Sequence, residues 1–102
     1  MKVDQVIWTS EAIFDLEVIY DFLAEKSPSA AERITNRILE RTRQLEEFPE
    51  SGAIQEKIVL EKEYRYLVEG NYKIIYRYKH LERTIFVEVV FDARQNPIDQ
   101  II

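Results

Sequence analysis

The sequence predicts an α+β domain of two layers, in which a helical hairpin packs on an antiparallel sheet in the chain order β-α-α-β-β-β. Apolar residues recur at helical spacing between residues 11 and 48, with one break near residue 27. From residue 58 the spacing changes to that of strands, and two turn signals divide this part of the chain. A length of 102 residues suits one domain, which we expect to cover residues 1–102.

The N-terminal third predicts a strand followed by a helix. Residues 3–8 are apolar and rich in β-branched side chains, and Trp8 is expected to anchor this strand in the core. Thr9 or Ser10 can cap the helix, and Glu11 places a negative charge in its first turn. The acidic residues of this helix are expected on a solvated face. Its apolar face is expected to consist of Ile13, Leu16, Tyr20 and Leu23, joined by Ala12 and Ile19.

A second helix starts where Ser27 and Pro28 interrupt the pattern. Either Ser27 caps it with Pro28 at the first helical position, or Ser29 caps it in a capping box with Glu32. Pro49 ends the helix, so the two helices form an antiparallel αα-hairpin. The apolar stripe of the second helix is expected to consist of Ala31, Ile34, Ile38, Leu45 and Phe48.

The C-terminal half predicts a meander of strands. Residues 58–60 are typical of a short strand or an irregular edge, and residues 64–68 and 72–78 of a hairpin around Gly70-Asn71. Residues 84–91 form an almost unbroken apolar run, which predicts a central strand buried on both faces. The first strand must add to one edge of this meander, and periodicity leaves both edges open. The hairpin loop predicts the pairs Val68–Lys73, Leu67–Ile74 and Arg65–Tyr76.

Composition and charge narrow the classes of function. The formal net charge is −5, and its acidity lies mainly in the first 32 residues. Proteins that grip nucleic acid usually have a basic balance, which this chain lacks as a whole. The absence of cysteine excludes disulfides and thiolate metal sites and favours a cytoplasmic location. No apolar run approaches the ~20 residues of a membrane span, so we expect neither a membrane association nor a signal segment.

Four features in this order carry a resemblance to a known family: the helices broken at Ser27-Pro28, the Phe-Pro-Glu-Ser-Gly of residues 48–52, residues 64–76, and the Val-Phe-Asp-Ala-Arg-Gln-Asn-Pro of residues 90–97. Together they closely resemble the ParE/RelE superfamily over nearly the whole chain. The resemblance implies a toxin of a type II toxin–antitoxin pair, in a homodimer or a toxin–antitoxin hetero-oligomer. It also implies a cognate antitoxin that lays a disordered segment over the toxin and orders on binding.

The superfamily divides by mechanism. RelE-like members cleave mRNA on the ribosome, which requires clustered cations and a general acid or base. ParE-like members poison DNA gyrase, which requires a binding surface and no catalytic group. By the resemblance, Lys73 and Arg94 stand where RNA-cleaving relatives carry basic residues, and Arg65 and Arg77 add neighbouring cations. Arg65, Lys73 and Arg94 are therefore the candidate contacts to a phosphate or to the cellular target.

Other positions depart from the RNA-cleaving pattern. Tyr64 and Tyr66 stand where RelE relatives present lysines, and residues 98–102 hold no terminal Tyr or His. Ala53 follows Gly52 where many relatives have an arginine. His80, the one histidine, falls in a hairpin loop where we expect it to be solvated.

The candidate residues also have structural interpretations. Lys73 and Arg77 can be polar residues of a half-exposed strand, and Arg94 can form a local ion pair with Asp92. The tyrosines of the hairpin are favoured strand residues, which indicates sheet packing more than a platform for stacking bases.

The sequence therefore predicts a toxin that acts by binding its target, with DNA gyrase as the ParE-like candidate. The alternatives are a ribosome-dependent mRNA endoribonuclease and a degenerate, non-toxic homologue that still binds an antitoxin. We assign no metal and no cofactor, since the sequence holds no Ser-His-Asp constellation, glycine-rich phosphate loop or carboxylates at ligand spacing. The antitoxin surface is expected in a groove between the helical hairpin and the sheet, where the acidic first helix suits a basic segment.

Overall fold

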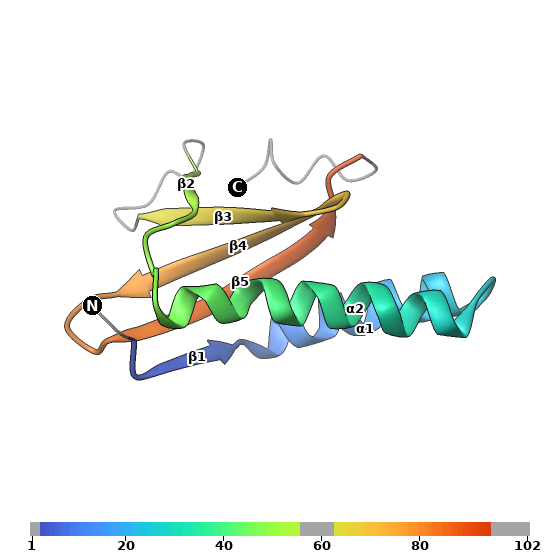
Figure 1. Ribbon diagram of the computed structural model, residues 1–102, viewed down its shortest axis with the longest axis horizontal. Helices are drawn as coiled ribbons and strands as arrows, with labels where there is room; N and C mark the ends of the chain where they lie inside the picture. The colour runs from blue at the N-terminus through green and yellow to red at the C-terminus, as the bar shows by residue number, and fades with distance from the viewer. Residues whose placement is uncertain (1–2, 56–62, 95–102) are drawn as a thin grey trace.

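A computed structural model describes residues 3–55 and 63–94. The elements follow the predicted order, with one additional short strand (Figure 1). They are β1 (Gln5–Trp8), α1 (Ser10–Ala24), α2 (Pro28–Arg43), a 3-10 turn (Gln44–Glu46), β2 (Ala53–Ile54), β3 (Tyr64–Glu69), β4 (Tyr72–Lys79) and β5 (Thr84–Asp92).

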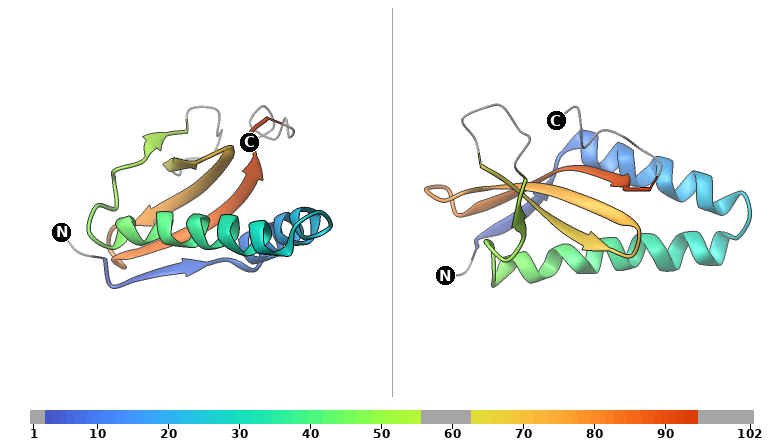
Figure 2. Two further views of the ribbon diagram at one scale, coloured as in Figure 1. Left: turned by 45° about the vertical axis from the view of Figure 1, so that its right-hand side comes forward. Right: turned by 90° about the horizontal axis from the view of Figure 1, so that it is seen from above.

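The five strands form one sheet in the order β1-β5-β4-β3-β2. The pair β1–β5 is parallel and the other neighbours are antiparallel. Both helices lie on one face of this sheet, α1 against β5 and α2 against β3 (Figures 1 and 2). The turn between the helices extends beyond the ends of β4 and β5 (Figure 2). This arrangement confirms the two-layer α+β fold.

The β3–β4 hairpin has the predicted register. Its loop is Gly70-Asn71, and Gly70 has a φ of +58° whereas Asn71 does not have a positive φ. A positive φ at the first loop residue alone is the pattern of a type II′ turn, which suits the right-handed twist of the strands. The three predicted pairs, Val68–Lys73, Leu67–Ile74 and Arg65–Tyr76, are all present.

The structure shows which strands form the two edges of the sheet, which periodicity did not predict. β1 joins the meander alongside β5, where Gln5 lies opposite Thr84 and Trp8 opposite Val87. At the other edge β2, which was not predicted, pairs with β3 through Ala53 and Ile54. Residues 58–60, predicted to form a short strand or an irregular edge, lie outside the described residues.

Hydroxyl caps begin both helices. The Thr9 Oγ1 accepts a hydrogen bond from the Ala12 N–H at 3.1 Å. The Ser27 Oγ accepts one from the Ala30 N–H at 3.2 Å, with Pro28 in the first turn, so the first of the two predicted capping alternatives is correct. The core between the helices and the sheet contains Ala12, Ile38, Leu45, Leu67, Tyr72, Ile74, Tyr76, Ile85, Val87 and Val90.

The predicted apolar face of α1 is wrong in part. Ile13 and Tyr20 are 46% and 38% exposed, whereas Leu16 and Ile19 pack against the core around the buried Ala12. The helix is apolar on more than one side, so spacing alone does not identify the side that packs on β5.

Phe48 does not extend the apolar stripe of α2, as was predicted, and is 63% exposed. The chain leaves α-helical geometry after Arg43, and although Leu45 of the 3-10 turn still lies in the core, Phe48 follows beyond that turn. Thr35 and Thr42 are buried on α2 instead. Their hydroxyls donate to the carbonyl oxygens of Ala31 and Leu39 at 2.8 and 2.7 Å, so burial leaves them hydrogen-bonded.

β5 lies inside the sheet as predicted, and Trp8 packs against the core from β1. Burial of β5 on both faces is only partly confirmed. Ile85, Val87 and Val90 are buried toward the helices. On the opposite face Phe91 is buried as well, whereas Phe86 and Val89 are half-buried.

Candidate functional site

Two of the predicted cations lie on the sheet face that points away from the helices. Side chains alternate along a strand, and Ile74 and Tyr76 of β4 belong to the core, so Lys73 and Arg77 lie on the opposite face. The Lys73 Nζ is 4.0 Å from the centre of the Tyr66 ring, a cation–π contact. The Arg77 Nε is 3.3 Å from the Glu88 Oε2, an ion pair that is largely shielded from solvent.

Arg65 lies on the other face of the sheet and does not meet Lys73. Its Nη1 donates to the carbonyl oxygens of Glu50 and Gly52 at 3.1 and 2.9 Å, and its Nη2 is 2.8 Å from the Glu63 Oε2. Only 18% of its side chain is exposed. Arg65 therefore binds the segment between α2 and β2 through hydrogen bonds to its backbone.

Arg94 follows β5 and binds Asp92 through two side-chain nitrogens and its backbone N–H. Its Nε and Nη2 lie 3.2 and 3.0 Å from the two carboxylate oxygens, and its backbone N–H donates to the Asp92 Oδ1 at 2.9 Å. The hydrogen bonds from Arg94 hold the pKa of Asp92 below its usual value, and Asp92 in turn raises the pKa of Arg94. The local ion pair suggested by the sequence is thus present.

The tyrosines divide between the two faces of the sheet. Tyr72 and Tyr76 are buried in the core, whereas Tyr64 and Tyr66 are half-exposed on the face that carries Lys73. The Tyr76 Oη accepts from the Gly52 N–H at 3.0 Å and donates to the Pro49 carbonyl at 2.9 Å. Burial raises the pKa values of Tyr72 and Tyr76. Sheet packing, the expected role, is observed for these two tyrosines.

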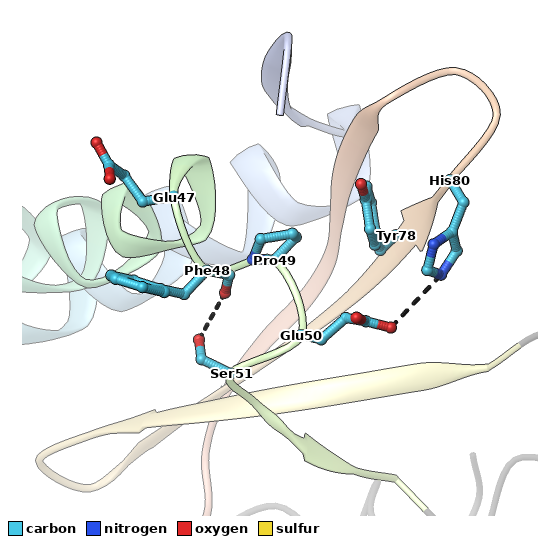
Figure 3. Close-up of a pocket in the computed structure, with 7 residues that line it drawn as sticks. All are labelled: Glu47, Phe48, Pro49, Glu50, Ser51, Tyr78 and His80. Atoms are coloured by element: carbon cyan, nitrogen blue, oxygen red, sulfur yellow. Dashed lines mark hydrogen bonds and ion pairs between the residues drawn. The ribbon is translucent and has the colours of Figure 1, made fainter. Parts of the chain in front are cut away.

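A cavity of about 480 Å³ lies beside His80. Phe48, Pro49 and Glu50 line it on one side, with Tyr78 and His80 on the other (Figure 3). The His80 ring centroid is 4.2 Å from that of Tyr78, and its Nε2 is 3.7 Å from the Glu50 Oε2. His80 is mostly exposed, as expected, and the carboxylate of Glu50 lies beside it. Such a wall of rings and carboxylate suits a cationic group better than a phosphate.

A second, apolar groove of about 400 Å³ runs between α1 and the ends of β4 and β5. Phe14, Val18 and Phe22 line it from one side of α1, although they are 63%, 49% and 61% exposed. Asp15 and Asp92 place carboxylates on its walls. Sequence reasoning missed this stripe, although its spacing of four residues was visible in the sequence and places the three side chains on one face of a helix.

The described residues contain no group of three or more His, Cys, Asp and Glu side chains that could hold a metal ion. Within that same part of the chain, every helix is too short or too polar to cross a membrane.

Comparisons with known proteins agree on one family. The family model described as "ParE toxin of type II toxin-antitoxin system, parDE" matches residues 6–97. Toxin RelE2 of Caulobacter vibrioides is 35% identical over 85 residues, which cover 78% of this chain and 97% of that protein. A solved chain described as "Chromosomal ParDE TA system from P. aeruginosa" has the same fold, with a TM-score of 0.68 at 22% identity over 86% of this chain and 94% of that one. The chain therefore belongs to the ParE toxin family of type II toxin–antitoxin systems, within the ParE/RelE superfamily.

Proposed function

We propose that this toxin acts by binding its cellular target, with DNA gyrase as the leading candidate, and not by cleaving RNA. The supporting observation is the separation of the three candidate cations. Arg65 faces the helical layer, Lys73 lies on the opposite face, and Arg94 follows β5. Cleavage of a phosphodiester needs cations gathered around one phosphate and a nearby general acid or base. The described residues do not supply such a cluster.

The cations that could be recruited are also engaged. Arg65 and Arg94 donate to carboxylates and carbonyl groups of their own chain, and Arg77 pairs with Glu88. An arginine held in this way can still shape a protein-binding surface, whereas contact with a phosphate requires its hydrogen bonds to be exchanged.

The second candidate function is mRNA cleavage on the ribosome. Lys73 and Arg77 share one face of the sheet with Tyr66, so two cations and an aromatic ring lie side by side where an RNA strand could pass. The similarity to a protein named Toxin RelE2 points in the same direction.

Two assays on the purified toxin separate the candidates. In the first, DNA supercoiling by gyrase is measured with rising toxin concentrations. In the second, a translation extract is supplied with a defined mRNA, and cleavage is mapped by primer extension. We expect inhibition of supercoiling and intact mRNA. Cleavage of mRNA in the ribosomal A site that disappears in Lys73→Ala would establish the ribonuclease instead. Normal growth of a bacterial host that expresses the toxin alone would favour a non-toxic homologue.

The cognate antitoxin is proposed to occupy the groove between α1 and the ends of β4 and β5. Its apolar stripe would be covered by a bound segment, and exposed apolar side chains that line a groove are typical of such surfaces. The exposed Glu11, Glu17 and Asp21 of α1 surround it with negative charge, which suits a segment with basic residues at its margins.

Replacing one phenylalanine at each end of the molecule tests this surface. Phe22 and Phe48 are 61% and 63% exposed, so Phe22→Asp and Phe48→Asp make the same change at similar exposure. We expect Phe22→Asp to weaken antitoxin binding at least tenfold and Phe48→Asp to leave it within about twofold. Hydrogen exchange should show protection by the antitoxin on α1. Equal affinities for both variants, or no protection on α1, would exclude the placement.

A further inference from the structure

A small groove on the other side of Tyr72 has a different chemistry from the apolar groove at α1. Its volume is about 200 Å³, and it lies between α2 and the β3–β4 turn. Arg33, Ile34 and Arg37 line it from α2, and Gly70, Asn71 and Tyr72 line it from the hairpin. Arg33 and Arg37 are four residues apart, so they project from the same side of the helix one turn from each other.

These two arginines differ from the other six of the chain. Arg41, Arg43, Arg65, Arg77, Arg83 and Arg94 each have a carboxylate oxygen within 4.0 Å. Arg33 and Arg37 have no hydrogen-bond or ion-pair partner within residues 3–55 and 63–94. In a protein of net charge −5, with 19 acidic residues, this places two uncompensated cations along one groove.

Nearby carboxylates do not neutralise the groove. Glu69 lines it, but its Oε1 is 3.9 Å from the Nε of Arg41, which also donates to the Val68 carbonyl at 3.1 Å. Asp92, at the far side of Tyr72, is bound by Arg94. An incoming carboxylate would therefore meet two free guanidinium groups, whose planar donor geometry matches its two oxygens.

The basic groove adjoins the apolar one. Tyr72, which is 8% exposed, lines both grooves, so the grooves adjoin at this residue. A peptide segment seated along Phe14, Val18 and Phe22 at α1 reaches the Arg33–Arg37 groove by passing over the end of β4. The two grooves would then bind two different parts of one segment.

We propose that the groove between α2 and the β3–β4 turn takes an acidic side chain of the antitoxin segment, held by Arg33 and Arg37, and thereby selects among antitoxins by charge. The proposal rests on the placement of the antitoxin at the α1 groove. A peptide fits better here than a nucleic acid, because the whole chain is acidic and the adjoining groove is apolar and bears carboxylates.

Selection from a random library of 16-residue peptides displayed on phage tests the proposal without knowledge of the antitoxin sequence. The immobilised targets are the wild-type toxin, Arg37→Glu, and the matched control Arg43→Glu, which reverses an exposed arginine of α2 outside the groove. Arg33→Glu serves as a second variant, and circular dichroism checks that each variant is folded. The best wild-type peptide is then labelled, and its Kd is measured by fluorescence anisotropy.

Wild-type and Arg43→Glu toxins should enrich peptides with Asp or Glu at a constant spacing from apolar residues, and Arg37→Glu should lose that preference. The Kd should rise about tenfold or more for Arg37→Glu, the loss of one charge-assisted contact, and less than about twofold for Arg43→Glu. An acidic preference that survives in Arg37→Glu, or is absent from the wild type, would overturn the proposal. So would displacement of the peptide by a single-stranded RNA that binds wild type and not Arg37→Glu.

The same peptides test this proposal separately from the proposal that the antitoxin binds the apolar groove at α1. Peptides that keep their affinity for Phe22→Asp but lose it for Arg37→Glu would retain the basic groove and refute the apolar antitoxin groove. Peptides that lose affinity for Phe22→Asp and keep it for Arg37→Glu would retain the apolar groove and refute the basic groove.

Discussion

The carboxylate of Asp15 accepts a hydrogen bond from the backbone N–H of Val90, with 3.0 Å between the Asp15 Oδ2 and the Val90 N. β1 pairs with β5 only as far as Val87, so Asp15 caps a backbone donor on the part of β5 that β1 does not reach. Burial raises the pKa of Asp15, and its effect exceeds the opposing effect of the Val90 N–H. A side chain of α1 thus satisfies a backbone donor at an unpaired part of β5, although the carboxylate charge of Asp15 is partly desolvated there.

Replacing Asp15 with Asn should remove part of the pH dependence of stability. The pKa of Asp15 in the folded state is raised above its ordinary value of 3.8, so the folded protein binds more protons between these two values. The contribution of Asp15 to stability is therefore present below 3.8 and is lost as the pH rises through the folded-state pKa. In Asp15→Asn, whose amide oxygen can still accept from Val90, the free energy of unfolding should not show this loss. Urea unfolding of both proteins between pH 4 and pH 7 checks this, and parallel curves would contradict it.

Asp92 should behave in the opposite way. The hydrogen bonds from Arg94 lower its pKa, so its contribution to stability is present above the ordinary value and is lost as the pH falls through the lowered pKa. Arg94→Ala should move the pKa of Asp92 back toward 3.8. Titration of the Asp92 carboxyl carbon by NMR measures the shift. Arg43→Ala, which removes an arginine distant from Asp92 in the sequence and paired with Glu40, should leave that titration unchanged.

Tyr76→Phe should destabilise the protein by about 1–3 kcal/mol, the cost of leaving buried polar groups without partners. The change removes the hydroxyl that binds both the Gly52 N–H and the Pro49 carbonyl, while the ring stays in place. Tyr64→Phe makes the same change on a half-exposed ring and should cost no more than about 0.5 kcal/mol. Chemical denaturation of the two variants gives the comparison, and equal losses would show that the buried Tyr76 hydroxyl stabilises the fold no more than the hydroxyl of the half-exposed Tyr64.

Gly52→Ala should also destabilise the fold, because a Cβ at this position would lie 2.6 Å from the Tyr66 carbonyl oxygen and 2.8 Å from the Tyr76 ring. Both neighbours are fixed in the sheet, so we expect a loss of about 1–3 kcal/mol, the range for overpacking. The control is Ala53→Ser, which adds one atom to an exposed side chain next to Gly52 and should change stability by no more than about 0.5 kcal/mol. A melting temperature lowered as much by Ala53→Ser as by Gly52→Ala would contradict this account.

The parts of the fold that local physics determines were predictable. The Gly70-Asn71 loop determines which residues face each other across the hairpin, and Ser27 with Pro28 starts α2, so register and helix boundary follow from short segments. The position of β1 beside β5 depends on residues nearly 80 positions apart, which no local pattern encodes. The inward side of α1 was mispredicted for the related reason that this helix offers apolar residues on several sides.

The candidate site was less predictable. Arg65, Lys73 and Arg94 were grouped by resemblance, and their joint role in a site stays a prediction. The predicted register already implied that Arg65 and Lys73 lie on opposite faces of the sheet. Arg65 pairs with Tyr76, and Tyr76 is three residues from Lys73 along β4, so their side chains point to opposite faces. That Arg33 and Arg37 have no ion-pair partner among residues 3–55 and 63–94 could not be predicted, because it depends on which carboxylates the folded chain brings near each arginine.

The parallel pairing of β1 with β5 also sets the timing of folding. β1 and α1 leave the ribosome long before β5, and β1 has no strand to join until Thr84 to Val87 have been made. The same holds for Asp15, whose hydrogen-bond partner is on β5. Until then the apolar side chains of α1 and β1 lack their main packing surface, and the apolar groove at α1 lacks the wall that Val90, Phe91 and Asp92 form. An antitoxin segment seated in that proposed groove can therefore capture the toxin only as its last strand is completed, whereas the residues that line the Arg33–Arg37 groove have all been made before β5.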